Sequence, residues 1–303
     1  MHSTVLAARA SRSTAQQLRL VLGLFKLRIG VMIMITAIVG MAVTPGPALS
    51  VLQVAVLALS VLGASASAGA FNQYYEYDTD RLMARTRTRA FVTGAVPHAP
   101  VWLAVMGALL ALSVGAAWLA LNAQAALFIF LGAFVYAVVY TVWLKRRSWT
   151  NIVVGGLAGS FAVLAGAAAV APALGPLPLL LALVLFLWTP PHFWSLAIAH
   201  HGEYAAAGVP MLPVVVGPQR AARSVFASTV GLVAVSLLPG LFGAGPVYMA
   251  GALLGGGWFL HKTWVLARCV NRKTAMGAFF ASLLQLSLVL GAASVDGLMR
   301  AHG

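Results

Sequence analysis

Long apolar runs constrain this chain more than any other feature of its sequence. A helix needs about 20 apolar residues to cross a bilayer, and nine runs approach or exceed that length. The chain is 61% hydrophobic and 8% charged, whereas a soluble domain carries about 25% charged residues. Transmembrane barrels are excluded because their strands are about 10 residues long and alternate in polarity. The predicted fold is all-α, a polytopic membrane bundle of nine transmembrane helices at about 27–45, 51–71, 101–121, 125–144, 151–171, 177–199, 221–243, 246–267 and 276–297.

Positive charge is confined to every second connection between these runs. The first, third, fifth and seventh connections are short and uncharged, while the other four carry Lys or Arg. Because cationic residues collect in cytoplasmic loops, we predict that the N-terminus lies inside and the C-terminus outside. The same rule accounts for the net charge of +14, so no nucleic-acid partner is expected.

The chain divides into a basic arm, residues 1–26, and one predicted membrane domain, residues 27–303. The arm is rich in Arg, Ser and Ala and has no acid. It is either an organelle transit peptide or a cytosolic tail that lies on anionic lipid. A bacterial inner membrane is the expected location, with the mitochondrial inner membrane as the alternative. The two longest connections, 72–100 and 200–220, lie on the predicted cytoplasmic side, where we expect the functional site.

Four of the five acidic residues fall in those two long connections, whereas Asp296 lies at an outer helix end and is assigned no functional role. Asn72, Glu76 and Asp80 are spaced four residues apart, so on a helix they project from nearly one face. Three such oxygen-bearing side chains suit Mg²⁺, which prefers oxygen ligands and shares them with substrate phosphates. The alternative is a loop in which neighbouring acids and cations neutralise each other.

Arginines follow these acids directly. Arg85 and Arg89 are also four residues apart, and the guanidinium fork suits phosphate oxygens. Lys145 and Arg146 begin the next inner connection and are candidates to close over the same anion. Acids for a metal followed by cations for an anion predict a site for a Mg²⁺–diphosphate complex.

The second long connection and the span before it hold further candidates. Glu203 lies beside His200 and His201, but adjacent histidines face different directions, so a zinc site is not expected. Pro190-Pro191 is predicted to interrupt the sixth span near its inner end, which is tolerated where backbone lines a cavity. His192 follows this pair; it either contacts a substrate or cofactor, or satisfies a carbonyl freed by the prolines.

Several motifs together resemble the UbiA-type intramembrane prenyltransferases. The segment “NQYYEYDTD”, which contains Asn72, Glu76 and Asp80, is similar to the N-D-x-x-D-x-x-x-D motif of that superfamily, and Arg85 to Arg89 match its R-T-x-x-R. Within the superfamily, “YTVWLKRRSWTNIVVGG”, “WTPPHFW” and “YAAAGVPMLPVVVG” resemble one branch, the protoheme IX farnesyltransferases. Glu76 stands where Asp is usual, and Gly202-Glu203 stands where the branch commonly has two acids.

The resemblance implies farnesyl diphosphate and heme B as substrates, Mg²⁺ as cofactor and heme O as product, with heme-copper oxidase assembly proteins as candidate partners. The nearer alternative is a UbiA-type enzyme with a quinone or chlorin acceptor; the more remote one is a polytopic transporter. The implied catalytic and metal-binding residues are Asn72, Glu76 and Asp80, with Glu203 as a further metal candidate. The implied diphosphate-binding residues are Arg85, Arg89, Lys145 and Arg146, and the acceptor-side candidates are Asn151, His192 and Tyr204.

Overall fold

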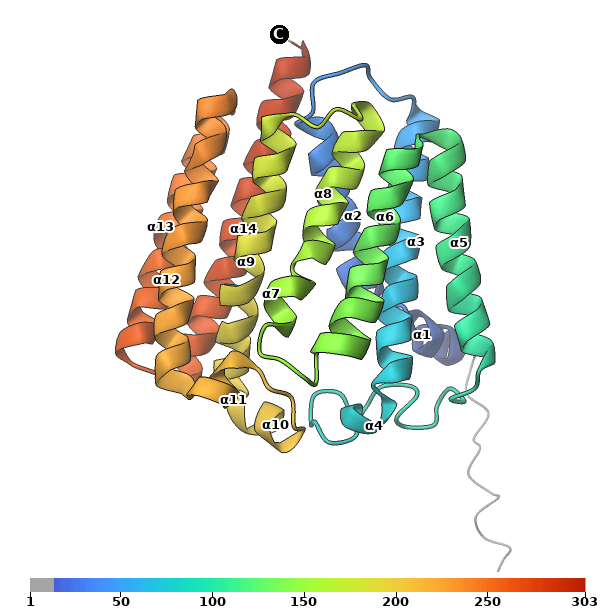
Figure 1. Ribbon diagram of the computed structural model, residues 1–303, viewed down its shortest axis with the longest axis vertical. Coiled ribbons are helices and arrows are strands. Elements are labelled where there is room, and N and C mark those ends of the chain that lie inside the picture. The colour runs from blue at the N-terminus through green and yellow to red at the C-terminus, as the bar shows by residue number, and fades with distance from the viewer. Residues whose placement is uncertain (1–13, 303) are drawn as a thin grey trace, which may run out of the picture.

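The computed structural model describes residues 14–302 and shows a bundle of long helices that run side by side between two ends (Figure 1). The all-α prediction is confirmed, since residues 14–302 contain no strand. The long elements are α2 (Leu27–Ala42), α3 (Val51–Tyr75), α5 (Val101–Ala120), α6 (Ala123–Phe134) with the π-helix η1 (Val135–Leu144), α7 (Asn151–Gly155) with α8 (Leu157–Val170), α9 (Pro176–Ala199), α12 (Pro218–Leu237) with the 3₁₀-helix η2 (Leu238–Phe242), α13 (Pro246–Arg268) and α14 (Arg272–His302). The shorter helices are α1 (Thr14–Leu24), α4 (Tyr77–Asp80), α10 (His201–Ala206) and α11 (Leu212–Val216).

Seven helical segments in the described chain are long and apolar enough to cross a membrane. The pair α1 and α2, bent by 51°, makes an eighth if it forms one broken span. The predicted span 246–267 corresponds to α13, which is long but less apolar because it contains Gly255 to Gly257 and the pair His261-Lys262. The chain is thus a multi-pass membrane protein, while the count of nine spans stays a prediction.

The connections alternate between the two ends of the bundle, as the charge pattern predicts. The short helices α1, α4, α10 and α11 gather at the lower end in Figure 1, together with both long connections. The C-terminal end of α14 lies at the opposite end, with the short connections (Figure 1). Residues 1–13, which include Arg9 and Arg12 of the predicted basic arm, lie outside the described residues.

Small residues allow the helices to approach closely. A Cβ atom added to Gly166 of α8 would lie 1.8 Å from the Ala37 carbonyl oxygen of α2. One added to Gly255 of α13 would lie 2.9 Å from the Gln285 Cα of α14. Close contacts of this kind are typical of helix packing in lipid. There the hydrophobic effect does not drive helices together, and small residues let the backbones approach and gain van der Waals contact.

Pro190 and Pro191 do not interrupt the sixth span, contrary to the prediction. Both lie inside α9, which continues as helix to Ala199. Proline removes backbone donors, but neighbouring side chains can satisfy the freed carbonyls in a membrane helix. The carbonyls that lose a donor are those of Phe186 and Leu187, four residues before the prolines. On either side of them, Ser195 donates its hydroxyl to the Pro191 carbonyl at 2.7 Å and Thr189 donates to the Leu185 carbonyl at 2.9 Å.

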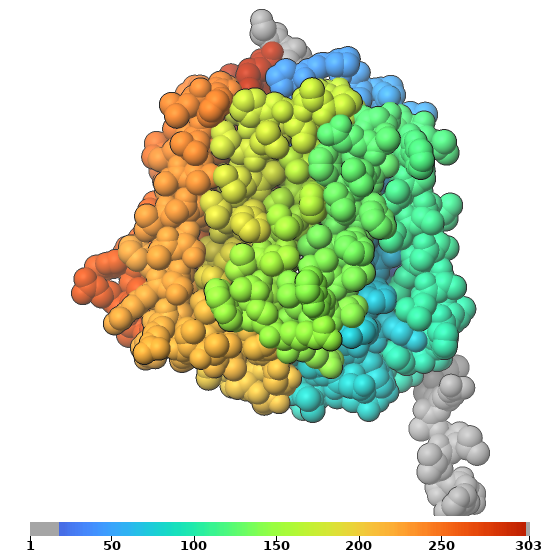
Figure 2. Space-filling model, in the orientation of Figure 1, coloured from blue at the N-terminus to red at the C-terminus, as the bar shows by residue number. Residues whose placement is uncertain are grey.

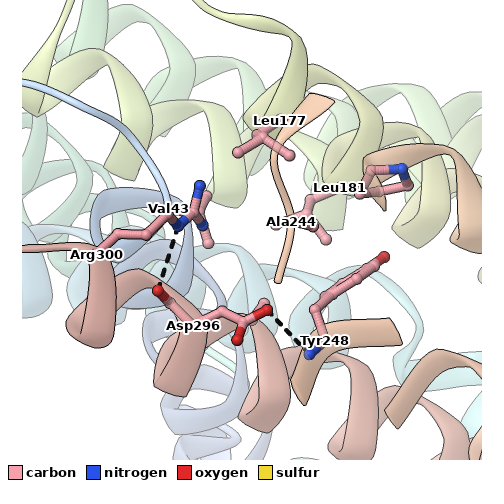
Figure 3. Close-up of a pocket in the computed structure, with 9 residues that line it drawn as sticks. Val43, Leu177, Leu181, Ala244, Tyr248, Asp296 and Arg300 are labelled. Carbon is pink, nitrogen blue, oxygen red and sulfur yellow. Dashed lines mark hydrogen bonds between the residues drawn. The ribbon is translucent and has the colours of Figure 1, made fainter. Parts of the chain in front are cut away.

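At the opposite end from the long connections, Asp296 has a structural role. It is 4% exposed, and its Oδ2 accepts the backbone N–H of Tyr248 at 2.9 Å (Figure 3). Tyr248 lies in the first turn of α13, whose N–H groups have no partner within the helix. A carboxylate from α14 therefore caps the N-terminus of α13.

The two long connections are folded segments that bring distant residues together. Residues 81–100 return against the end of α3, where His98 stacks on Tyr74 with 4.0 Å between ring centroids. Phe91 is 1% exposed and lies edge-on to Tyr74 at 5.7 Å. The space-filling view shows that residues around 80, 145 and 205 meet at this lower end (Figure 2).

Candidate active site

The three candidate metal ligands lie along one helical face, as their spacing predicts. The helix is disturbed only at Glu76, between α3 and α4. The Glu76 N–H still donates to the Asn72 carbonyl at 3.0 Å, and the Asp80 N–H donates to the Glu76 carbonyl at 2.8 Å. All three residues are buried, with exposures of 2%, 2% and 3% for Asn72, Glu76 and Asp80.

Each of these three side chains is held by a cation, and Glu76 lies near two. Lys26 donates from Nζ to Asn72 Oδ1 at 2.6 Å. Lys145 forms an ion pair with Glu76 Oε1. Arg89 forms an ion pair with Asp80 Oδ2, and its Nη1 also lies 3.9 Å from Glu76 Oε2.

Burial shifts the pKa of the Asp80 carboxyl more strongly than the neighbouring charges do. Desolvation raises the pKa of Asp80 above its usual value, while the charge and hydrogen bond of Arg89 oppose that shift. Keeping this buried group ionised therefore depends on the positive charge beside it.

The segment after α4 folds back so that Arg89 faces the acids. Thr86 donates its hydroxyl to the Asp80 carbonyl at 2.9 Å, and the Arg89 N–H donates to the Thr86 carbonyl at 2.9 Å. Thr86 is buried, whereas Arg85 is exposed. The structure therefore brings Arg89 to the acids, and it leaves Arg85 at the surface of the same loop.

The π-helix η1 supplies the opposite wall. Thr141 accepts the Asn72 side-chain N–H at 3.0 Å, which fixes the Asn72 amide between Thr141 and Lys26. Tyr136 and Tyr140 stack at 5.7 Å, and Lys145 Nζ lies 5.7 Å from the Tyr140 ring. Short π-helical segments occur frequently at functional sites, and this one directs polar side chains from a membrane helix towards the acids.

The residues present fit a hard divalent cation. Glu76 Oε2 is buried and has no hydrogen-bond partner. Two carboxylates and one amide offer oxygen donors, and Mg²⁺ takes oxygen ligands while keeping positions for water and substrate phosphate. No group of three or more His, Cys, Asp and Glu side chains suited to a metal occurs in the described part of the chain.

Comparison with known proteins shows to which family the chain belongs. The UbiA prenyltransferase family matches residues 33–286. The chain belongs to the UbiA prenyltransferase family. Protoheme IX farnesyltransferase 2 of Paramagnetospirillum magneticum is 56% identical over 93% of this chain and 98% of that protein. The protoheme IX farnesyltransferase of Azotobacter vinelandii is 41% identical over 97% of each chain. The resemblance found in the sequence motifs is thus confirmed.

Solved structures support the same fold. A digeranylgeranylglyceryl phosphate synthase superposes with a TM-score of 0.79 at 18% identity, covering 94% of this chain and 99% of its own. A UbiA homolog from Archaeoglobus fulgidus bound to DMAPP and Mg²⁺ gives a TM-score of 0.71 at 19% identity, covering 89% and 98%. The fold agrees with the family, and membership of a prenyltransferase family sets the transporter alternative aside.

Glu203 of this UbiA prenyltransferase has a different partner from Glu76 and Asp80. Its Oε1 lies 3.0 Å from His200 Nδ1, and Oε2 is buried without a partner. The hydrogen bond to His200 lowers the pKa of Glu203, and Arg85 of the other long connection adds to that effect. Glu203 thus faces Arg85, and its role as a metal ligand stays a prediction.

Lys145 and Arg146 both reach the segment 76–80. Arg146 is exposed and donates to the Thr79 hydroxyl, while Lys145 pairs with Glu76. Asn151 is fully buried and donates from Nδ2 to the Lys145 carbonyl at 3.2 Å, so it positions the backbone that carries Lys145. Its Oδ1 has no partner.

The remaining acceptor-side candidates occupy two different surroundings. Tyr204 is buried beside Tyr140, which also has Glu76 as an electrostatic neighbour. His192 packs between α9 and α14, where its Nδ1 lies 2.6 Å from Ser282 Oγ and its ring stacks on Trp188 at 4.1 Å. These contacts give His192 a packing role, and its contact with an acceptor stays a prediction.

Sequence reasoning missed Lys26, Tyr136 and Thr141. Lys26 counts in the sequence only as one more cation of the basic arm. Tyr136 and Tyr140 are four residues apart at the inner end of an apolar span, and that polar spacing was the available signal for this wall.

Proposed function

We propose that this chain transfers a farnesyl group from farnesyl diphosphate to a vinyl group of heme B, giving heme O for heme-copper oxidases. The observation that carries the proposal is the pairing of Asn72, Glu76 and Asp80 with three cations in a chain 56% identical to a protoheme IX farnesyltransferase. Mg²⁺ held by those oxygens would neutralise charge that grows on the departing diphosphate.

The chain's own residues have distinct tasks in this reaction. Arg89 and Lys145 stabilise the phosphate oxygens as the carbon–oxygen bond of the donor breaks and its electron pair leaves with diphosphate. The vinyl π electrons of heme then form the new carbon–carbon bond, and water adds hydroxide to the resulting cation, releasing a proton. The stacked faces of Tyr136 and Tyr140 stabilise the allylic cation before that attack.

The proposed setting follows the charge pattern. Nine spans place the N-terminus inside and the C-terminus outside, with connections 72–100 and 200–220 at the cytoplasmic face of a bacterial inner membrane. The bacterial origin of the named relatives supports that location over a mitochondrial one. Residues 27–303 act as one domain, and heme-copper oxidase assembly proteins are the proposed partners of this enzyme.

Mass spectrometry of extracted heme tests the proposal. The chain is expressed in cells that lack their own heme O synthesis, and the pigments are separated and analysed by mass spectrometry. A heme that carries one added farnesyl group and one added hydroxyl group is expected. Unchanged heme B together with a prenylated quinone or chlorin would contradict the heme acceptor and favour the alternative acceptor class.

A further inference from the structure

Lys26 occupies an unusual backbone position. It separates α1 from α2 at the 51° bend, with φ 47° and ψ 42°, and is the one non-glycine residue with positive φ in the described part of the chain. A side chain is disfavoured in this left-handed region. Such positions cluster at functional sites, where the surrounding structure over-determines them.

The bend directs the lysine side chain into the bundle. Its stem passes over Gly69 of α3, where an added Cβ would lie 3.4 Å from Lys26 Cβ. Its Nζ donates to Asn72 Oδ1 at 2.6 Å and to the Tyr136 hydroxyl at 3.2 Å. The ammonium therefore lies at the same cluster of oxygens as the acids.

Lys26 also lines a cavity of about 400 Å³. Its lining contains three cations and no acid, and Arg89 belongs both to this cavity and to the acid cluster. The residues that line it are Arg19, Leu20, Gly23, Lys26, Ile29, Gln73, Thr88, Arg89 and Ala90. An anion in this cavity is within reach of Lys26 and Arg89 together.

We propose that Lys26 is a further diphosphate-binding residue, which holds Asn72 Oδ1 until the metal takes that oxygen and then turns onto the diphosphate. The proposal rests on the proposed function. An ammonium and a divalent cation repel each other strongly at a buried site, so a metal on Asn72 Oδ1 displaces the lysine. The adjoining cavity gives it room, and the phosphate oxygens give it a new partner.

A merely structural lysine would behave differently. If Lys26 only fixes the corner between α1 and α2, glycine should replace it without loss, because glycine adopts positive φ readily. If its ammonium binds diphosphate, glycine and methionine should both weaken diphosphate binding. Lys26→Gly and Lys26→Met thus separate the backbone from the charge.

The test is calorimetric titration of the purified full-length protein in detergent with inorganic pyrophosphate in saturating Mg²⁺. Both Lys26 variants should bind pyrophosphate about 10- to 100-fold more weakly, the loss expected for one charge-assisted hydrogen bond. Arg28→Met, an exposed cation two residues away, is the matched control and should bind as the unaltered protein does.

Titration with Mg²⁺ alone gives a second, opposite expectation. Lys26→Met should bind Mg²⁺ at least as tightly as the unaltered protein, because the competitor for Asn72 Oδ1 is gone. Pyrophosphate affinity in both variants equal to that of the unaltered protein would overturn the role of Lys26 alone. A loss in Lys26→Met that does not occur in Lys26→Gly would overturn it as well. Failure of the unaltered protein to bind Mg²⁺ and pyrophosphate would instead overturn the proposed function.

Discussion

Buried carboxylates occur at both ends of this bundle, and their partners differ in kind. At one end Asp296 accepts a backbone N–H of α13 (Figure 3), and Gly245 is so close that an added Cβ would lie 2.8 Å from its oxygens. At the other end Glu76 and Asp80 are held by the tips of Lys145 and Arg89.

The difference decides what each carboxylate can do. A backbone partner is fixed by the helix, so Asp296 cannot exchange it without loosening α13. Lys145 and Arg89 are long side chains that can exchange a carboxylate for a phosphate while the helices stay in place. The same chemistry therefore stabilises structure at one end and prepares for ligand exchange at the other.

Asp80→Ala should have the largest effect on activity. The variant loses a metal ligand and leaves Arg89 without its main partner. We expect farnesyl transfer to fall on the order of 10²- to 10³-fold, the range for losing one preorganised electrostatic group, while expression stays near normal. Heme O formation per mole of purified protein measures this. Full activity in Asp80→Ala would refute the metal site.

Arg89→Met should have a smaller and more selective effect. Losing one charge-assisted contact to phosphate should raise the KM for farnesyl diphosphate about 10-fold or more. Arg87→Met changes an exposed arginine of the same loop and should leave KM unaltered. Initial rates over a range of farnesyl diphosphate concentrations make the comparison, and equal KM values in both variants would remove Arg89 from the diphosphate site.

The sequence predicts the helical class, the alternation of the connections and the acid face well, because hydropathy and four-residue spacing are local properties. Asn72, Glu76 and Asp80 align because the helical hydrogen bonds continue past the disturbance at Glu76. Arg89 also follows from its nearness in sequence to the acids.

The other half of the site depends on contacts between residues far apart in the chain. Lys26 contacts Asn72 because Lys26 itself adopts the left-handed conformation at the bend between α1 and α2. Thr141 contacts Asn72 from the π-helix η1. Neither conformation has a local sequence signature. The expected break at Pro190-Pro191 was wrong, because α9 continues as one helix through both prolines to Ala199.

Asp296→Ala should have the smallest effect on activity and a clear effect on stability. Removing the acceptor leaves the Tyr248 N–H buried and unpaired, which costs about 1–2 kcal/mol for a lost cap. Activity per mole of folded protein should stay unaltered, because the carboxylate lies at the other end of the bundle from Asp80. Thermal denaturation in detergent, run beside Asp80→Ala, makes the comparison. A normal melting temperature combined with lost turnover in Asp296→Ala would reverse the roles assigned to the two ends.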